Sequence, residues 1–293
     1  MRKILVTGGL GFIGSNLVDK LVSDNQVWVI DDLSSESSSK EYINPKANYV
    51  FKSIIDILEI SELENINFDV VFHLAAKARI QPSFEDPVTY FDTNSLGTIK
   101  LLEYARKSSV KFFIYATTSS KNHKEGKFLT PYTFSKVIGE EICKLYSDIY
   151  NMNISLATFY NVYGPREPKI GEWATVVAKF ERQLLNGESL TVVGDGEQMR
   201  DFTHVSDICD GLIEISKHNF KFQNFDLGRG EPTKIIDLAR MLSNNIVFVN
   251  KRINEGDYTN SNWEKTESLI GWRAKHNLKD YIEKIKQMNG QTS

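Results

Sequence analysis

One tyrosine and one lysine have a spacing that suits acid–base chemistry, Tyr132 and Lys136. A separation of four residues places both side chains on one face of a helix, close enough for the ammonium to act on the phenol. Because a nearby cation favours the phenolate, Lys136 would lower the pKa of Tyr132 from its ordinary value near ~10. Tyr42 and Lys46 share the spacing, but Pro45 lies between them and disfavours a helix.

A run of hydroxyl side chains precedes this pair. Residues 112–116 have the apolar character of a buried strand, and residues 117–120, all Thr or Ser, follow at its end. Substrates bind at the carboxyl ends of strands in a doubly wound sheet. Thr118 is therefore the candidate to donate a hydrogen bond to a reacting oxygen held by Tyr132. The alternative that stays open here is a polar turn beside a surface tyrosine.

The first fourteen residues have the pattern of a dinucleotide-binding turn. Residues 4–6 are an apolar strand, and residues 12–21 have the spacing of an amphipathic helix. Gly9 and Gly11 allow a tight turn that approaches a pyrophosphate, and Gly14 lets the helix lie against the strand. The free N–H groups at the start of that helix would face the anion.

Asp31 indicates which dinucleotide binds. It directly follows the second expected strand, residues 27–30. A carboxylate at this position accepts hydrogen bonds from the adenine ribose and repels a 2′-phosphate. Asp32 adds a second negative charge, and Ser34 and Ser35 stand where an NADP enzyme would offer Arg or Lys. We therefore expect NAD(H), whose nicotinamide cation would further favour the phenolate of the candidate tyrosine.

Apolar strands alternate with helical patterns along most of the chain. The strands are continuously apolar, as in a parallel sheet with both faces covered, so we expect an α/β doubly wound sheet, or Rossmann fold. Further strands are expected at 49–51, 70–74, 112–116 and 154–159, and long helices at 87–106 and 132–150. The first domain is expected over 1–165, with 202–230 returning to it, and a smaller, discontinuous substrate domain over 166–293, with a helix near 175–185 and a strand at 190–193.

Composition restricts the class of protein. The chain has 293 residues, of which 41% are hydrophobic and 25% charged, and a formal net charge of −3. This charge gives no reason to expect a nucleic acid or a membrane as partner. Two cysteines, Cys143 and Cys209, make a disulfide framework or a metal site improbable. The apolar stretch before the first glycines is too short for a signal peptide or a membrane span, so we expect a cytoplasmic protein.

The chain resembles the extended short-chain dehydrogenase/reductase family. The resemblance extends over nearly the whole chain. Within the family, the chain is most similar to NAD-dependent nucleotide-sugar 4-epimerases of the UDP-glucose or UDP-N-acetylglucosamine type. It rests on the glycine-rich turn ending at Gly14 and on Asp31, Asp56-Ile57, His73-Leu-Ala-Ala76, Asn94, Thr118, Tyr132 with Lys136, Asn161-Val-Tyr-Gly-Pro-Arg166, the segment 194–202 and Leu269-Ile-Gly-Trp272.

The resemblance implies a set of site residues. Catalysis would fall to Thr118, Tyr132 and Lys136. Residues that would contact NAD are Gly8, Gly11, Phe12, Ile13, Gly14, Asp31, Asp32, Ser34, Asp56, Ile57, Leu74, Ala75, Ala76, Asn94, Ala116, Tyr132, Lys136 and Tyr160, with Asp56 and Ile57 at the adenine and Asn94 supporting the catalytic helix. Residues that would hold the nucleotide sugar, a UDP-sugar by this resemblance, are Thr118, Asn161, Ala174, Thr175, Val176, Arg200 and Arg252. A guanidinium such as that of Arg200 suits a diphosphate by charge and geometry.

Several positions depart from the family pattern. Thr158 stands where the family usually has Arg, Asn254 where a second phosphate-binding Arg often lies, and the loop 119–131 is short. Related dehydratases and decarboxylases place a Glu two residues after the catalytic Thr, but this chain has Ser120, which is too weak an acid or base for elimination. We therefore expect a 4-epimerase. The alternatives are a reductase of nucleotide keto-sugars and a dinucleotide-sensing protein without turnover.

A homodimer is also expected. The family resemblance implies one, and Val137, Ile138, Ile142 and Leu145 supply more apolar positions on the catalytic helix than the sheet can cover. Some of them should contact a symmetry mate, together with the segment 96–106.

Overall fold

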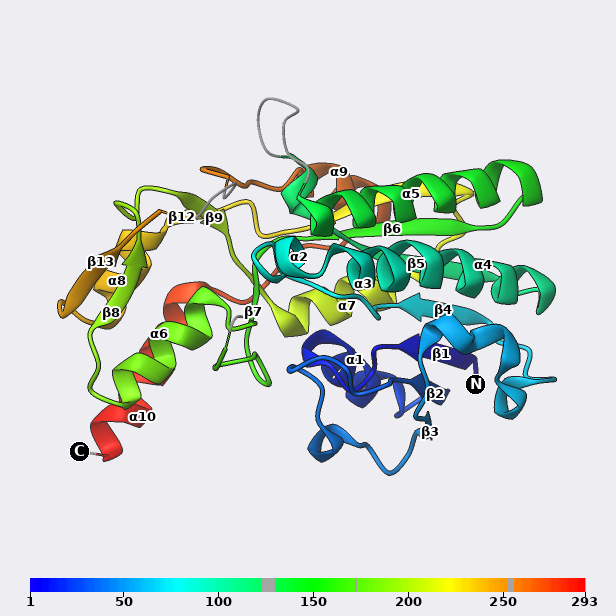
Figure 1. The fold of residues 1–293 in the computed structure, drawn as a ribbon, viewed down its shortest axis with the longest axis horizontal. Helices are drawn as coiled ribbons and strands as arrows, with labels where there is room; N and C mark the ends of the chain where they lie inside the picture. The colour runs from blue at the N-terminus through cyan, green and yellow to red at the C-terminus, as the bar shows by residue number, and fades with distance from the viewer. Residues whose placement is uncertain (123–129, 172, 252–255, 293) are drawn as a thin grey trace.

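The computed structural model describes residues 1–122, 130–171, 173–251 and 256–292. Within them lies a parallel sheet of seven strands in the order β11-β6-β5-β4-β1-β2-β3 (Figure 1). The predicted doubly wound α/β fold is confirmed. The strands are β1 (Lys3–Thr7), β2 (Gln26–Ile30), β3 (Asn48–Val50), β4 (Val70–His73), β5 (Phe112–Thr118), β6 (Ile154–Phe159) and β11 (Phe222–Leu227).

The strand order reverses between β1 and β4, which are neighbours in the sheet. The connections from these two strands leave in opposite directions, so the sheet has a crevice at their carboxyl ends. Helix α1 (Phe12–Leu21) starts directly after β1, and Gly11 in an extended conformation is its N-cap. The tight approach of α1 to β1 places the glycine-rich turn at this crevice.

Helices cover both faces of the sheet. On one face α1 packs with α7 (Val205–Ile215) around the buried side chains of Val6, Leu17 and Ile208. On the other face α4 (Gly97–Lys107) and α5 (Pro131–Tyr150) enclose Leu102, Tyr115 and Cys143. The expected single helix at 87–106 is instead α3 (Pro87–Phe91), a π-helical turn η4 (Asp92–Leu96) and α4.

A smaller unit packs beside the carboxyl end of the sheet, on the left of Figure 1. Its own core joins Phe180 of α6 (Val176–Leu185), Val192 of β8 (Leu190–Val193), Leu238 of α8 (Ile235–Leu242) and Ile282 of α10 (Leu278–Thr292). The strand β13 (Ile246–Val249) pairs in parallel with β8. The segment 263–274 leaves this unit, and its Trp272 is buried in the core beneath the large sheet.

The remaining elements are short connections. They are η1 (Lys40–Tyr42), η2 (Ile54–Glu59), η3 (Ser61–Leu63), α2 (Pro82–Glu85), η5 (Ser119–Asn122), β7 (Val162–Tyr163), β9 (Met199–Asp201), β10 (Thr203–His204), β12 (Pro232–Lys234) and α9 (Trp263–Ile270). Among the residues that the structure describes, no helix combines the length and the apolar character needed to cross a bilayer.

The glycine-rich turn provides a test of this packing. A Cβ added to Gly14 would collide with the carbonyl of Gly8, whereas a Cβ added to Gly11 would lie 3.4 Å from that same oxygen, an ordinary contact. We expect Gly14→Ala to lower the free energy of unfolding by about 1–3 kcal/mol, the usual cost of overpacking. Gly11→Ala is the matched control and should leave thermal unfolding nearly unchanged. Equal melting temperatures for the two variants would contradict the close approach of α1 to β1.

Candidate active site

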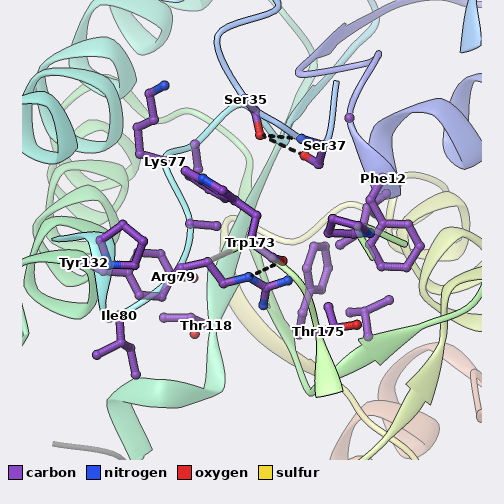
Figure 2. Close-up of a pocket in the computed structure, with 18 of the residues that line it drawn as sticks. Phe12, Ser35, Ser37, Lys77, Arg79, Ile80, Thr118, Tyr132, Trp173 and Thr175 are labelled. Carbon is purple, nitrogen blue, oxygen red and sulfur yellow. Dashed lines mark hydrogen bonds between the residues drawn. The ribbon is translucent and has the colours of Figure 1, made fainter. Parts of the chain in front are cut away.

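One elongated cavity of about 960 Å³ follows the carboxyl edge of the sheet. It extends from the glycine-rich turn, past the ends of β4 and β5, to α6 and β8 in the smaller unit. Its volume is at the upper end of the range for small-molecule sites. Figure 2 shows side chains around this space, among them Tyr132 and Thr118 near the ends of the large sheet and Trp173 and Thr175 from the segment before α6.

Tyr132 and Thr118 meet in the wall of this cavity. Helix α5 begins at Pro131, with the Thr130 side chain accepting a hydrogen bond from the backbone N–H of Thr133. Proline is favoured at the first helical position, so the sequence fixes where the helix starts and puts Tyr132 in its first turn. Thr118 is the last residue of β5 and pairs with Phe159.

Electrostatics around the tyrosine differ from the sequence-based expectation. Burial raises the pKa of Tyr132, while the Thr118 hydroxyl and the charge of Arg79 act to lower it. Lys136 is buried, and its ammonium lies 4.0 Å from the centre of the Tyr115 ring. Burial lowers the pKa of Lys136 to about 7. The charge of Arg79 therefore also acts on the phenol, and the spacing argument did not identify this cation.

The cofactor side brings together most of the residues predicted for it. The cavity wall contains Gly8, Gly11, Phe12, Ile13, Gly14, Asp31, Asp32, Ser34, Leu74, Ala75, Ala76, Ala116, Tyr132 and Lys136. Gly8 has a φ of +70°, and a Cβ there would lie 2.8 Å from the backbone of Ala75. Only glycine fits this close approach of two loops, and the resulting cradle suits a dinucleotide.

Asp31 ties this cradle together. Its two carboxylate oxygens accept hydrogen bonds from the backbone N–H of Leu10, at 2.9 Å, and of Leu33, at 2.8 Å. Burial raises the pKa of Asp31, and these two N–H groups oppose the rise. Lys77, which sequence reasoning did not single out, donates to the backbone oxygen of Ser34 at 2.9 Å and closes the same side of the cavity.

The structure does not bring Asp56 and Ile57 to the cavity. Asp56 is exposed and Ile57 is buried in the core, whereas Lys52 and Ile54 line the wall. The 3-10 helix η2 starts at Ile54, so Ile54 and Ile57 are one turn apart. The contact of Asp56 and Ile57 with the adenine stays a prediction.

Tyr160 also lies away from the cavity. Its hydroxyl donates to a carboxylate oxygen of Asp226 at 3.0 Å and accepts from Asn122 at 3.2 Å. Burial raises the pKa of Tyr160. The neighbouring Phe159 lines the wall instead, because successive residues of an extended chain face opposite sides.

Asn94 lies behind the cavity wall and joins two segments that form it. Its side-chain oxygen accepts from the backbone N–H of Lys77 at 2.8 Å, and its amide group donates to the Lys77 carbonyl and to the Ser135 hydroxyl, both at 2.9 Å. Ser135 lies on α5 beside Lys136. The π-helical turn that contains Asn94 therefore holds α5 against the loop after β4.

The substrate side contains Asn161, Ala174, Thr175, Val176 and Arg200 in the cavity wall. The guanidinium of Arg200 donates to the backbone oxygens of Met199, at 3.0 Å, and of Gly256, at 2.7 Å. Thr158, at the position where the family usually has Arg, is buried and donates to Asn224 at 2.8 Å. Arg252 and Asn254 lie outside the described residues.

Arg79 and Glu167 are among the charged residues of the wall that sequence reasoning did not find. Arg79 follows β4 by six residues, and Glu167 follows the Asn161-to-Arg166 motif directly. Glu167 is buried, and its carboxylate accepts from the Thr175 hydroxyl and from the backbone N–H of Gly164. Their positions after strands were the signal in the sequence that could have indicated these two residues. Only the fold determines that their side chains face the cavity.

Glu167 makes stability depend on pH. Burial raises the pKa of Glu167 to about 8, against 4.5 in an unfolded chain. The folded state therefore holds this proton more tightly, and its contribution to stability is complete below pH 4.5 and is lost as pH rises toward 8. The isosteric variant Glu167→Gln removes the titration. Its melting temperature minus that of the wild type should increase between pH 5 and pH 8, and a constant difference over that range would contradict the assignment.

Comparisons with known proteins agree with this geometry. The model of the NAD dependent epimerase/dehydratase family matches residues 4–228. A UDP-glucose 4-epimerase of Mycolicibacterium smegmatis is 32% identical over 305 residues, with 96% of each chain covered. The structure of a UDP-glucose 4-epimerase of Thermotoga maritima with UDP-glucose gives a TM-score of 0.91 at 30% identity over 99% of both chains. A UDP-glucose 4-epimerase of Thermus thermophilus in complex with NAD gives 0.89 at 25% identity over 99% of this chain and 100% of the other. The chain therefore belongs to the NAD dependent epimerase/dehydratase family, and its cofactor is NAD.

Proposed function

We propose that this protein is a nucleotide-sugar 4-epimerase that acts on a UDP-sugar. The observation that carries the proposal is the meeting of Tyr132 and Thr118 in one cavity, which the glycine-rich turn lines at one end and Arg200 at the other. A nucleotide sugar that reaches from Arg200 toward the glycine-rich turn would present its sugar to the phenol. The relatives named above, which are UDP-glucose 4-epimerases, support a UDP-sugar as the substrate.

Each residue has a distinct role in this reaction. Tyr132 takes the proton of the C4 hydroxyl and later returns it, and Thr118 hydrogen-bonds the same oxygen. When bound along the glycine-rich turn, NAD would supply reversible hydride chemistry at C4 of the sugar. The buried Lys136, with a pKa of about 7, holds or releases a proton beneath the tyrosine near neutral pH.

The contacts of Asp31 and Glu167, two of the acidic residues of the described cavity wall, favour epimerisation over elimination. Asp31 is engaged by the glycine-rich turn, and the Glu167 carboxylate is engaged by Thr175 and Gly164. Ser120, two residues after Thr118, bonds that threonine through its backbone N–H at 3.1 Å and offers no carboxyl group. An elimination at C5 and C6 requires a general acid or base near those atoms, whereas an oxidation and reduction at C4 with NAD requires only the tyrosine as acid and base.

Removing one oxygen atom tests the catalytic assignment. Tyr132→Phe keeps the ring in place, so the fold and NAD binding should persist, while conversion of UDP-glucose or UDP-N-acetylglucosamine to its C4 epimer should fall by about 10²–10⁴-fold or more. Chromatography of the UDP-sugars measures the conversion. Tyr42→Phe is the matched control, because Tyr42 has the same spacing to a lysine but lies in η1, away from the cavity wall, and should leave the rate unchanged.

The same assay separates an epimerase from the alternatives. An epimerase returns the hydride that it removes, so the product should form without net consumption of NADH and without deuterium from heavy water at C4. Stoichiometric oxidation of NADH would identify a reductase. Full activity in Tyr132→Phe would show that the catalytic residue is wrong, and absence of any reaction in the wild type across UDP-, dTDP- and GDP-sugars would favour a sensor.

We further propose a homodimer formed by the outer face of α5. Val137, Ile138 and Ile142 are partly buried, but Leu145 and Ile149 are exposed on this helix. Exposed apolar stripes on paired helices are a common basis for two-fold assemblies.

Light scattering measures the oligomeric state. The protein should have twice the mass of one 33.4 kDa chain at micromolar concentration. Leu145→Glu should shift it toward the monomer, because a charge would be buried in the interface. Val247→Glu, which also replaces an exposed apolar residue but on β13, is the control and should leave the dimer intact. A monomeric wild type would contradict the proposal.

A further inference from the structure

Behind the cavity wall, one carboxylate of α5 joins three segments of the chain. Glu140 lies one helical turn after Lys136, so both side chains are on the same face of the helix. Its Oε1 accepts a hydrogen bond from the Thr117 hydroxyl at the end of β5 and lies 2.7 Å from the Nζ of Lys121 in η5. The Lys121 and Glu140 side chains are only 17% and 14% exposed. Because solvent screens such a pair poorly, its charges act on nearby groups.

The face of β5 that contacts Glu140 also contacts Lys136. Tyr115 and Thr117 are two residues apart on the strand, so both point toward α5. The Lys136 ammonium lies 4.0 Å from the centre of the Tyr115 ring, and the Tyr115 hydroxyl donates to the Lys136 backbone oxygen at 3.2 Å. A Cβ added to Gly139 would collide with that hydroxyl, so α5 and β5 are in direct contact here. Lys136 and Glu140 are therefore neighbours on one closely packed interface.

Most of the titratable groups near Lys136 carry no charge near neutral pH. Among the residues that the structure describes, the groups that face it are Tyr132, Glu140 and Cys143 of α5, Tyr115 of β5, His73 of β4 and Lys121 of η5. Burial lowers the pKa of the His73 ring and raises the pKa of the Tyr115, Tyr132 and Cys143 side chains. The charges that remain are those of the ion pair, on Glu140 and Lys121.

These two charges have opposite effects on the lysine. Burial lowers the pKa of Lys136 to about 7, Cys143 and Glu140 oppose this fall, and Lys121 adds to it. Because the Cys143 thiol is protonated near neutral pH, Glu140 is the anion that opposes the effect of burial there. The ion pair therefore lies where it can set whether Lys136 holds its proton.

Building on the proposed function, we propose that Glu140 is a positioning residue that acts through Lys136: its carboxylate holds the proton on that lysine, and Lys121 limits the effect. The Lys136 ammonium lies one helical turn from Tyr132 and favours the phenolate that the reaction needs. Burial acts against an ammonium, so a negative charge one turn behind it keeps it protonated at the pH where the phenol must lose its proton. The contacts of Glu140 with Thr117 and Lys121 fix that charge in place.

Two substitutions with opposite expected effects test this role. Glu140→Gln is isosteric and keeps an oxygen for the Thr117 hydroxyl, so it should fold, but it removes the negative charge and should lower the pKa of Lys136 by about 1. Lys121→Met removes the cation and leaves the carboxylate, so the pKa of Lys136 should rise. The ¹³C NMR signal of the Lys136 Cε, in lysine-labelled protein with NAD bound, measures this pKa without turnover. Loss of that signal in Lys136→Met assigns it.

An ion pair with a purely structural role predicts a different result. Breaking it from either side would loosen the same contact, so Glu140→Gln and Lys121→Met would change the pKa of Lys136 in the same direction or leave it unchanged. Asp148→Asn is the matched control, because it breaks an exposed pair with Lys144 on the same helix. It should leave the pKa of Lys136 unchanged.

The rate of epimerisation gives a second readout. A fall of about 1 from a pKa of about 7 reduces the protonated fraction of Lys136 at pH 7 from half to about one in ten, so kcat at pH 7 should fall about 5-fold in Glu140→Gln. In Lys121→Met kcat should not fall at this pH. KM for the UDP-sugar should stay the same in both variants, because neither side chain lines the cavity.

Shifts of opposite sign in the two variants would support the role of Glu140. Shifts of the same sign, or an unchanged pKa of Lys136 in Glu140→Gln, would overturn it and leave the ion pair as a structural contact. Opposite shifts in a protein whose wild type forms no C4 epimer from any UDP-sugar would support the hold of Glu140 on the lysine proton and overturn the proposed reaction.

Discussion

The close contact between the glycine-rich turn and the ends of β2 and β4 determines the cofactor side of this protein. Asp31 accepts hydrogen bonds from Leu10 and Leu33, so one buried carboxylate holds the turn to the chain that leaves β2. Gly8 lies against Ala75 after β4 with no room for a side chain. The cradle thus exists because three chain segments meet where the strand order reverses, and a larger residue or a missing carboxylate would separate them.

A second polar residue has the equivalent role on the catalytic side. Asn94 joins the loop after β4 to α5 through Lys77 and Ser135, and it sits in a π-helical turn that breaks the regular helix. His73, at the end of β4, links Thr7 of β1 to Thr98 of α4 at 2.8 and 2.9 Å. Burial lowers the pKa of His73 well below its ordinary value, so this link is made by a neutral ring. These buried polar contacts join β1, β4, α4 and α5 and thereby fix the position of Tyr132.

Short sequence motifs predicted the local structure that they determine directly. The glycine turn, Asp31 and the Thr130-Pro131 helix start each act within a few residues, and the seven-stranded sheet follows from continuously apolar strands. Orientation is harder to predict from sequence. Ile57 and Tyr160 belong to matching motifs, but Ile57 is buried in the core, the Tyr160 hydroxyl donates to Asp226, and neither residue lines the cavity. Arg79 was missed because its importance depends on Trp173, ninety-four residues away, which no spacing rule connects.

The segment from Gly164 to Thr175 explains how the two halves of the cavity act as one site. Although it leads into the smaller unit, its position is set by the cofactor domain: Asn16 donates to the Pro165 carbonyl at 3.1 Å, and Arg166 pairs with Asp19 at 2.7 Å. Arg79 holds the Trp173 carbonyl from the other side. Because side chains of α1 and of the loop after β4 fix this segment, the wall that faces the sugar is built by the same elements that build the dinucleotide cradle. Under the proposed function, the large sheet would therefore set the distance between cofactor and sugar, and variation in the smaller unit would change the nucleotide end without moving the reacting carbon from Tyr132.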